Sequence, residues 1–435
     1  MADLVVAVVG GGQLARMMAP AAAALGVHLR ALVEDRTSSA AQVIPYSRVG
    51  AANDEVEIRA LVAGAQAARG RREAAPANDG SDGGADGRAA DVLTFEHEHV
   101  PNSLLEQLVS EGHPVRPDAS ALVHAQDKIV MRRRLGELGV PCPRWVELPD
   151  AGALETFLGQ VGGTAVVKTA RGGYDGKGVR IVKSTAEVAD WFEASKAVDG
   201  PRIPLLAEEK VPFTRELAVL VARRPSGQVR AWPVVESVQA AGVCAEVIAP
   251  APGLDPEVAR AATQLAITIA EGLGVTGVLA VELFEVPGID GGLPTVVVNE
   301  LAMRPHNCGH WTIEGSTTSQ FEQHLRAVLD LPLGGTAARE GWSVMVNVIG
   351  TGSADPVDAL AAVTALDDGV KVHLYGKSPR PGRKLGHVTV IGDDLPQVLA
   401  RARAAASILS RGNMSAPAGV VTPIGSDSAG DREQS

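Results

Sequence analysis

A polar stretch with several reactive side-chain types follows an apolar run at residues 295–298. Asn299 and Glu300 come directly after this run. The next ten residues carry four side chains that hydrogen-bond readily, namely Arg304, His306, Asn307 and His310. We predict a strand that ends where Asn299 begins the polar stretch. Beyond it we predict an exposed loop, because the stretch holds too little apolar material for a core segment.

A second apolar run, residues 278–284, carries a single acid, Glu282. If the two runs are neighbouring strands, Glu282 and Glu300 bring two carboxylates together. Hard oxygen donors suit Mg²⁺, which takes one or two protein carboxylates and usually phosphate oxygens as well. The pair therefore predicts a magnesium site, with Mn²⁺ as a possible substitute, beside a phosphate-bearing ligand.

Glycine is concentrated in residues 171–178, between predicted strands at residues 165–168 and 179–182. Backbone without side chains can approach a polyphosphate closely, and Lys168 at the end of the first strand adds a positive charge. A plain flexible hairpin is the alternative. The stretch is not a Walker A loop, because it lacks the Gly-Lys-Ser/Thr ending and the helix that follows it.

Two further stretches are basic. Residues 118–138 predict one helix, whose basic side chains at Lys128 and at positions 132–134 are interpreted as a solvated face. Residues 375–387 predict a basic loop that includes Lys377 and Arg383. This loop is either solvated or binds a substrate phosphate.

The N-terminus supplies the first elements that could position these groups. Residues 4–9 predict a buried strand, residues 10–15 a glycine turn, residues 13–25 a helix and residues 28–33 a second strand. The turn and the following acids at positions 34–35 come close to a dinucleotide-binding fingerprint. Nicotinamide or flavin binding is one interpretation, and a turn that grips another anion or none is the other.

A further strand is predicted at residues 91–95, and the sequence Glu-His-Glu-His follows it at residues 96–99. The alternation could suggest a metal site, but we interpret it as a strand end with exposed polar side chains. Residues 69–90 are of low complexity and predict a disordered insertion, and residues 412–435 predict a disordered tail.

Composition limits the classes of function. The 435 residues are 46% apolar and 21% charged, as in a globular protein with several cores. The net charge of −11 argues against nucleic acid as a partner. The three cysteines are far apart in sequence and predict neither zinc binding nor disulfides. No signal peptide and no membrane-spanning segment is predicted, so a cytoplasmic location without membrane partners is expected.

Several motifs occur in a recognisable order along the chain. They are the lysine strand, the Gly-Gly-Tyr-Asp-Gly-Lys-Gly hairpin, the Glu-Glu-Lys-Val segment, the Val-Glu-Leu-Phe and Asn-Glu strands, and the Arg-Pro-His-Asn loop. A Ser-Gln-Phe-Glu-Gln-His segment and the Tyr-Gly-Lys and Arg-Lys-Leu-Gly-His sequences follow. This order resembles the ATP-grasp enzymes, and within them the N5-carboxyaminoimidazole ribonucleotide synthetase family of purine biosynthesis. The similarity runs from Gly10 to His387 and leaves out the insertion and the tail.

The resemblance implies an α/β chain that is α+β in its central part. A doubly wound, parallel-sheet domain at residues 1–121 would precede an ATP-grasp domain at residues 122–335. A small β-rich domain would follow at residues 336–411. The implied activity is an ATP-dependent carbon–nitrogen ligase reaction. It would carboxylate 5-aminoimidazole ribonucleotide with bicarbonate, through carboxyphosphate.

The family's functional residues can be carried over to matching positions. ATP would contact Lys128, Lys168, Gly173, Tyr174, Asp175, Gly176, Lys177, Gly178, Glu208, Glu209, Lys210, Val211, Glu216, Gln239, Asn299 and Glu300. The ribonucleotide would contact Tyr174, Asp175, Arg304, His306, Asn307, Lys377 and Arg383. Catalytic roles would fall to Asp175, Arg304 and Lys377, and the metal would be held by Glu282 and Glu300.

The family also implies a homodimer and a functional link to the mutase that acts next in the pathway. Three positions depart from its usual pattern. Met303 and Cys308 replace a proline and a serine, and Gln239 stands where histidine is common. A thiol is a poor donor, so Cys308 weakens one expected hydrogen bond to substrate.

Two alternatives belong to other classes. The first is a different ATP-grasp ligase, such as a formate-dependent ribonucleotide transformylase or a biotin carboxylase-like enzyme, which the Arg304 to His310 loop disfavours. The second is a nicotinamide-dependent oxidoreductase or a dinucleotide sensor built on residues 10–35. Under the second, the ATP-directed residues from Lys168 onward would have no role.

Overall fold

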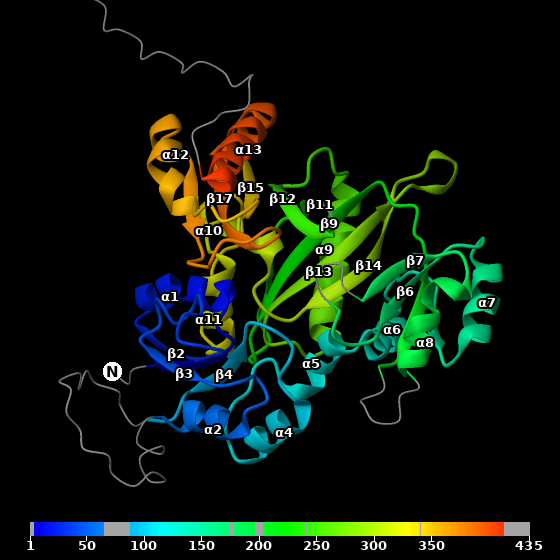
Figure 1. Ribbon diagram of the computed structural model, residues 1–435, viewed down its shortest axis with the longest axis horizontal. Coiled ribbons are helices and arrows are strands. Elements are labelled where there is room, and N and C mark those ends of the chain that lie inside the picture. The colour runs from blue at the N-terminus through cyan, green and yellow to red at the C-terminus, as the bar shows by residue number, and fades with distance from the viewer. Residues whose placement is uncertain are drawn as a thin grey trace, which may run out of the picture.

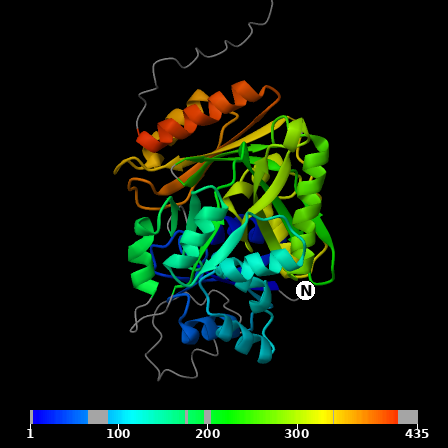
Figure 2. The same ribbon diagram turned by 90° about the vertical axis from the view of Figure 1, so that its right-hand side faces the viewer.

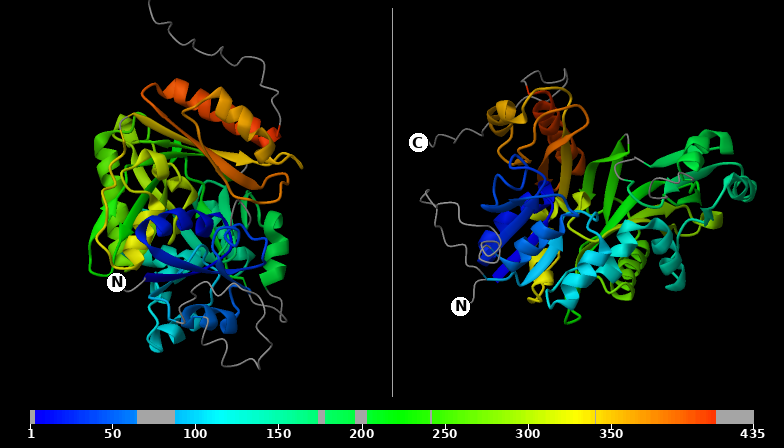
Figure 3. Two further views of the ribbon diagram at one scale, coloured as in Figure 1. Left: turned by 90° about the vertical axis from the view of Figure 1, so that its left-hand side faces the viewer. Right: turned by 60° about the horizontal axis from the view of Figure 1, so that its bottom comes forward.

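The structure is a computed structural model that describes residues 4–64, 88–173, 178–195, 203–240, 242–339 and 341–412. Most of the predicted insertion and all of the tail beyond Gly412 therefore lie outside the described residues. So do Tyr174, Asp175, Gly176 and Lys177 of the glycine hairpin. Three lobes surround a central sheet (Figure 1, Figure 3). None of the helices in the described part of the chain has the length and apolar character needed to span a bilayer.

The N-terminal lobe is a parallel sheet with the strand order β3-β2-β1-β4. Its elements are β1 Leu4–Val9, α1 Gln13–Leu25, β2 Val27–Val33, β3 Tyr46–Val49, α2 Glu55–Ala63, β4 Val92–Phe95 and α4 Asn102–Ser110. Successive side chains of a strand point to opposite faces. Val5 and Ala7 accordingly share a core with α2 and α4, whereas Val6 and Val8 share one with α1 and with α11, Gln320–Val328. Helices on both faces confirm the predicted doubly wound domain.

A small lobe lies on the other side of the molecule from the N-terminal lobe (Figure 1). Its strands include those that hold Lys168 and Glu208. Its strand order is β5-β8-β6-β7. Its elements are β5 Trp145–Leu148, α7 Ala151–Gln160, β6 Ala165–Thr169, β7 Val179–Val182, the 3-10 helix η1 Thr185–Val188, α8 Ala189–Ser195 and β8 Leu205–Glu209. Leu154, Phe157 and Phe192 contribute to a core of its own. The lobe is therefore a separate packing unit.

The central sheet has nine strands in the described residues, ordered β14-β13-β9-β11-β12-β15-β17-β16, with β10 paired to β9. The elements up to β14 are β9 Arg215–Arg223, β10 Val229–Ala231, β11 Val235–Ala240, β12 Val243–Ala249, α9 Pro256–Gly272, β13 Gly277–Val286, the 3-10 helix η2 Ile289–Gly291 and β14 Thr295–Ala302. Helix α9 packs on one face of β9, β13 and β14. Helix α11 contacts β13 and β9 from the other face, so it lies between the central sheet and the N-terminal sheet.

The C-terminal strands continue the central sheet. Their elements are β15 Trp342–Ile349, the 3-10 helix η4 Pro356–Ala359, α12 Leu360–Leu366, β16 Lys371–Leu374, β17 Lys384–Gly392 and α13 Leu395–Arg411. Strand β15 pairs antiparallel with β12, with Ser343 opposite Ala249. Helix α13 covers the outer face of this part of the sheet (Figure 2). The domain boundary that we propose at residue 336 therefore does not separate two sheets.

One predicted helix is two helices. Residues 118–138 form α5, Ala119–Gln126, and α6, Lys128–Glu137, with Asp127 between them. Asp127 has φ −134° and ψ 109°, and its carboxylate accepts hydrogen bonds from the backbone N–H groups of Ile129 and Val130. The prediction of one helix was wrong because an aspartate can end one helix and cap the next. The break places Lys128 in the first turn of α6.

Candidate active site

Glu282 and Glu300 lie opposite each other on β13 and β14, at a register shift between Glu282 and Leu283. Strand β14 runs on to Ala302, so the prediction that it ends at Asn299 was wrong. The strand continues because its backbone stays paired with β13 through the irregularity. The two glutamates therefore face each other across a strand pair at one edge of the central sheet, since β14 is the last strand in the order.

Glu282 resists ionisation. Burial, followed by the charges of Glu300 and Glu216, raises the pKa of the Glu282 carboxyl to about 8. A bound cation would relieve the repulsion between these carboxylates. Among the described residues no group of three or more His, Cys, Asp and Glu side chains could hold a metal by itself. Two carboxylates fit Mg²⁺ better than a metal with an all-protein ligand set, because Mg²⁺ keeps waters and phosphate oxygens.

Two lysines lie beside this pair. Lys128 Nζ is 3.1 Å from Glu300 Oε1. Lys168 Nζ is 2.7 Å from Glu208 Oε2 and donates a hydrogen bond of 3.4 Å to Asn299 Oδ1. The structure therefore brings together Lys128, Lys168, Glu208 and Glu300, which come from four different elements, α6, β6, β8 and β14. Positive charge next to paired carboxylates is an arrangement that can bind the phosphates of a metal-bound nucleotide.

Arg132 is a site residue that the sequence interpretation missed. It was assigned to a solvated face, but its side chain is 1% exposed. Arg132 Nε lies 2.7 Å from Glu208 Oε1, and its other nitrogens donate to the carbonyl oxygens of Val298 and Asn299. Lys128 and Arg132 are separated by four positions and so lie on one face of α6. This spacing is the signal that could have identified Arg132.

Glu208 is held ionised. Burial would raise the pKa of its carboxyl, but the positive charges of Lys168 and Arg132 outweigh this effect and lower the pKa to about 2. Arg132 thus joins the small lobe, through Glu208, to strand β14 of the central sheet. The Glu208 carboxylate is thus occupied by these two cations, and its backbone lies in β8 between β5 and β6.

The other residues expected around ATP lie on neighbouring elements. Glu209 follows on β8, and its carboxylate pairs with Arg144 at 2.7 Å. Glu216 lies on β9 opposite Phe284, and burial raises the pKa of its carboxyl. Lys210 is exposed and Val211 is partly buried. Gln239 on β11 donates a hydrogen bond to Ser237 Oγ. Gly173 and Gly178 flank the part of the hairpin that lies outside the described residues.

Arg304 and His306 start the polar stretch that follows β14. Arg304 Nε is 2.8 Å from Glu98 Oε1, so this arginine connects the central sheet to the loop after β4. His306 Nε2 is 3.4 Å from Glu282 Oε1. Its Nδ1 accepts a long hydrogen bond of 3.4 Å from the backbone N–H of Cys308. Burial, with the charge of Arg304, lowers the pKa of His306 to about 3, so the imidazole is neutral.

The polar stretch is buried, which contradicts the prediction of an exposed loop. His310 and Trp311 are 0% exposed, Cys308 is 1% exposed and Asn307 is 7% exposed. The segment forms the short helices η3, Asn307–Gly309, and α10, Thr312–Gly315. It packs between the central sheet and α11, where Cys308 and Trp311 join an apolar core. Gln320 bonds to His306 and His310, whereas the Asn307 amide and His310 Nε2 are buried without a hydrogen-bond partner among the described residues.

Glu96 was expected to be exposed, but it is buried and occupies the glycine turn. Its carboxylate accepts hydrogen bonds from the backbone N–H groups of Gly12 and Ala15, at the start of α1. A Cβ atom at Gly10 or Gly12 would lie 2.2 Å or 2.4 Å from atoms of Glu96. The place where a dinucleotide phosphate would bind is therefore filled by a carboxylate of the protein itself. This geometry disfavours the nicotinamide-binding alternative.

Lys377 and Arg383 lie on the loop between β16 and β17. Lys377 Nζ contacts Gln13 Oε1 in the first turn of α1 and lies 5.5 Å from the centre of the Tyr375 ring. Arg383 donates a hydrogen bond of 3.1 Å to the carbonyl oxygen of Ser378. The loop thus reaches the N-terminal domain next to Glu96.

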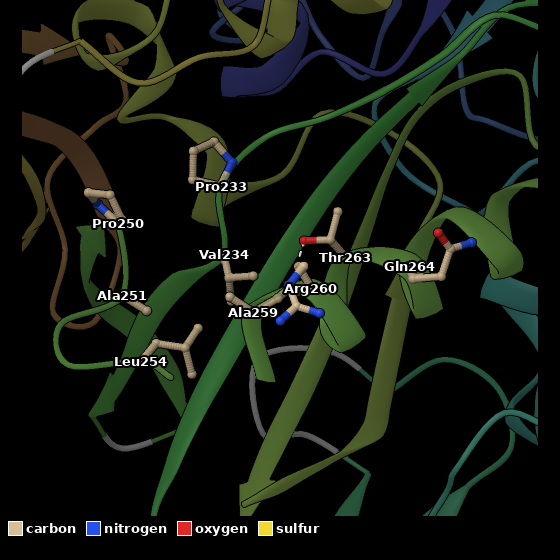
Figure 4. A pocket seen from close by; sticks show the side chains of 9 residues that line it. All are labelled: Pro233, Val234, Pro250, Ala251, Leu254, Ala259, Arg260, Thr263 and Gln264. Atoms are coloured by element: carbon tan, nitrogen blue, oxygen red, sulfur yellow. Dashed lines mark hydrogen bonds between the residues drawn. The ribbon is translucent and has the colours of Figure 1, made fainter. Parts of the chain in front are cut away.

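A groove of about 520 Å³ lies elsewhere, between α9 and the segments around Pro233 and Pro250 (Figure 4). Apolar side chains from Val234, Ala251 and Leu254 line it, with Arg260 at one side. It shares no residue with the candidate site.

The chain is similar to known proteins along most of its length. Three family models match the chain. The ribonucleotide synthetase preATP-grasp domain matches residues 4–79, the ATP-grasp domain matches residues 133–321, and the phosphoribosylaminoimidazole carboxylase C-terminal domain matches residues 343–401.

Similar proteins agree along most of the chain. An N5-carboxyaminoimidazole ribonucleotide synthase of Mycobacterium bovis is 49% identical, and the matched region spans 94% of this chain and 88% of the Mycobacterium bovis protein. The enzyme of that name from Corynebacterium ammoniagenes is 46% identical, with coverage of 93% and 92%. A crystal structure of N5-carboxyaminoimidazole synthase from Aspergillus clavatus, in complex with ADP and 5-aminoimidazole ribonucleotide, has a TM-score of 0.78 at 29% identity. It covers 94% of this chain and 99% of its own.

Proposed function

This chain belongs to the N5-carboxyaminoimidazole ribonucleotide synthase family of ATP-grasp ligases, and from this premise we propose the reaction of its site. The protein carboxylates 5-aminoimidazole ribonucleotide to N5-carboxyaminoimidazole ribonucleotide, with ATP and bicarbonate as co-substrates, in purine biosynthesis. The observation that carries the proposal is the Glu282–Glu300 pair flanked by Lys128 and Lys168. This arrangement suits a metal-bound triphosphate, and the buried polar stretch beside it suits a second, polar substrate.

The proposed chemistry has two steps. A bicarbonate oxygen attacks the γ-phosphorus of ATP while the bond to the β–γ bridging oxygen breaks, which gives carboxyphosphate and ADP. The exocyclic amine of the ribonucleotide then bonds to the carbon of carboxyphosphate, or of the CO₂ that forms when its phosphate leaves. Phosphate is released in either case, and the nitrogen loses a proton. Little covalent work falls to the protein in phosphoryl transfer, so its residues act by positioning and by charge.

Each part of the site has a proposed task. Lys128 and Lys168 hold the phosphates, and the backbone from Glu208 to Val211 lines the adenine. Glu282 and Glu300 would hold Mg²⁺, which supplies charge neutralisation at the transferring phosphoryl group. Arg304, His306 and Asn307 surround the aminoimidazole ribonucleotide. Lys377 and Arg383 bind its phosphate. Tyr174 and Asp175 are assigned to the same substrate from the family pattern alone.

The wider setting is part of the proposal. We place the reaction in the cytoplasm, with a homodimer as the working state and delivery of the product to the next enzyme, a mutase. The domain limits at residues 121 and 335 remain proposals of the same kind.

Omission of single substrates tests the function. ADP formation should require both bicarbonate and aminoimidazole ribonucleotide, and removal of either should reduce it to background. A formate-dependent transformylase would instead form ADP when formate replaces bicarbonate. Full ADP formation with formate and none with bicarbonate would contradict the proposal.

The metal assignment has its own test. Glu300→Gln removes one carboxylate of the pair and should abolish turnover, because the remaining carboxylate binds Mg²⁺ too weakly. ADP formation near the wild-type rate at saturating Mg²⁺ would contradict this assignment.

A further inference from the structure

Gln320, in the first turn of α11, is fully buried and makes an unusual set of contacts with the polar stretch. Its Oε1 accepts the backbone N–H of His306 at 2.8 Å, and its Nε2 donates to the His306 carbonyl oxygen, also at 2.8 Å. The same Nε2 lies 3.0 Å from His310 Nδ1. One amide side chain therefore pairs with both backbone groups of His306 and with a second ring in the same stretch.

These contacts fix the orientation of the amide, the tautomer of the His310 ring and the backbone of His306. Because Oε1 receives a backbone N–H, Nε2 is the donor, and His310 Nδ1 must accept. All the polar atoms of the Gln320 amide are then used. The backbone of His306 cannot rotate without breaking both hydrogen bonds, and from this fixed backbone its ring nitrogen Nε2 reaches to 3.4 Å from Glu282 Oε1. The fit is tight, because a Cβ atom at Gly309 would lie 2.4 Å from Gln320 Oε1.

We infer that Gln320 is a positioning residue for the carboxylation reaction: it holds His306 and the adjoining polar stretch in the geometry that the ribonucleotide site requires. The expected effect on kcat/KM rests on the proposed function. Gln320 itself has no place among the groups that contact substrate, since it lies behind the backbone of His306. Gln320 contributes by orienting the groups around the substrate, because a displacement of such groups by about 1 Å can lower the rate by about a hundredfold.

The chain contains a matched control on the same helix. Gln323 is also fully buried, and it forms the same pair of hydrogen bonds with a backbone, donating to the Gly334 carbonyl oxygen at 2.9 Å and accepting the Gly334 N–H at 2.8 Å. Gly334 belongs to the segment before β15 and contacts no proposed site residue in the described structure. Loss of the Gln323 amide thus removes equivalent hydrogen bonds from the same helix without touching His306.

The test compares Gln320→Met with Gln323→Met, since methionine keeps the length of glutamine and removes the amide. Both variants should lose similar thermal stability. Gln320→Met should lower kcat/KM for aminoimidazole ribonucleotide about tenfold or more. Its affinity for ADP alone, measured by calorimetry, should change less than about twofold, because Lys128, Lys168 and Glu208 do not contact Gln320. Gln323→Met should leave both quantities within about twofold of wild type.

Equal kinetic losses in the two variants, or wild-type kcat/KM in Gln320→Met, would overturn the inference. If Gln320→Met does not fold, Gly309→Ala is the second variant. Its Cβ would lie 2.4 Å from Gln320 Oε1 and 2.6 Å from Leu220 Cδ1, so it displaces the amide and should show the same selective loss of kcat/KM; wild-type kinetics there would also overturn the inference.

The proposed function and this inference can fail separately. Wild-type protein that forms no ADP in response to aminoimidazole ribonucleotide would contradict the function. Crystal structures would then decide the inference. Displacement of His306 in Gln320→Met but not in Gln323→Met supports it, and an unmoved ring in both variants overturns it.

Discussion

Glu282 is one of the two carboxylates proposed to hold the metal, and its ionisation changes near neutral pH. It shares a strand pair with Glu300 and carries a pKa raised to about 8 by burial and by the charges of Glu300 and Glu216. A metal ion and a proton therefore compete for the same carboxylate. The competition makes metal affinity depend on pH near neutrality, where an ordinary glutamate is already fully ionised.

Metal affinity should accordingly increase with pH in the protein without nucleotide. The proton on Glu282 must leave below pH 8 for the carboxylate to bind, so the apparent affinity for Mn²⁺ should rise at least about tenfold from pH 6.5 to pH 8.5. Electron paramagnetic resonance of free Mn²⁺ measures this directly. Glu282→Gln should bind weakly with no such rise. Equal wild-type affinity at the two pH values would contradict the assignment.

Glu208 should contribute to acid sensitivity. Its pKa falls from the usual 4.5 to about 2 on folding, so its stabilising effect is present above pH 4.5 and is lost as pH falls toward 2. The whole effect is about 3 kcal/mol in the free energy of unfolding.

Urea unfolding between pH 6 and pH 3 can isolate this effect. Wild type should lose more stability over that range than Glu208→Gln, which no longer has the carboxylate. At pH 6 the variant should be less stable by about 3–5 kcal/mol, because Arg132 and Lys168 lose their buried partner. Parallel pH profiles for the two proteins would show that Glu208 is not held ionised.

At the scale of the element, the start of α1 is defined by Glu96 rather than by a ligand. The carboxylate caps backbone N–H groups that would otherwise bind an external anion. Glycine is needed in the turn because Glu96 leaves no room for a Cβ atom at Gly10 or Gly12.

Gly12→Ala should therefore destabilise the protein by about 1–3 kcal/mol, since the new Cβ would lie 2.4 Å from Glu96 Oε1. Gly136→Ala is the matched control. A Cβ atom there meets nothing within 4 Å, and α6 should gain up to about 1 kcal/mol from the better helix former. The free energy of unfolding in urea measures both, and a stabilised Gly12→Ala would refute the packing argument.

The elements differ in how well the sequence predicts them. Helix α1 has the predicted bounds, because its glycine flanks and apolar spacing agree. The helix over 118–138 was mispredicted because an aspartate such as Asp127 can occur either on the exposed surface of a helix or as an N-cap, and the sequence does not distinguish the two. The Glu282 and Glu300 strands were predicted from apolar runs, and their pairing is found in the structure.

Tertiary contacts explain the misses at the site. The sequence marks Glu96, Arg132 and the 304–310 stretch as polar, and polar residues usually lie at the surface. Each makes specific buried contacts here, although the Asn307 amide in the stretch has no hydrogen-bond partner among the described residues. The partners in these contacts are the α1 backbone for Glu96, Glu208 for Arg132 and Gln320 for the stretch. The roles of the individual residues in the candidate site stay predictions.

At the scale of the whole molecule, the loop between β16 and β17 contacts the N-terminal lobe. Lys377, from the loop before β17, contacts Gln13 at the start of α1. Helix α11 packs against both the N-terminal sheet and the central sheet, and His324 on it bonds to Thr94 of β4 and to the backbone N–H of Val278 on β13. These contacts connect the N-terminal lobe to the central sheet and to the loop before β17.

Lys377→Ala should raise the KM for aminoimidazole ribonucleotide by about tenfold or more, with the KM for ATP changed less than about twofold, because one charged contact to a phosphate is lost at one substrate only. Steady-state assays with each substrate varied give both constants. Lys371→Ala, an exposed lysine on β16, is the control and should change neither. Equal increases in both KM values for Lys377→Ala would argue against a phosphate contact.

The pairing of β12 with β15 has a consequence for any shortened form of the protein. Ending the chain before residue 341 would strip the hydrogen-bonding partner from Glu246, Val247, Ile248 and Ala249. It would also expose Ile248, which packs in the same core as α13. An unpaired strand of this kind is a template for intermolecular association. A fragment holding every phosphate-directed residue up to Arg304 should therefore precipitate instead of working as a minimal ATPase.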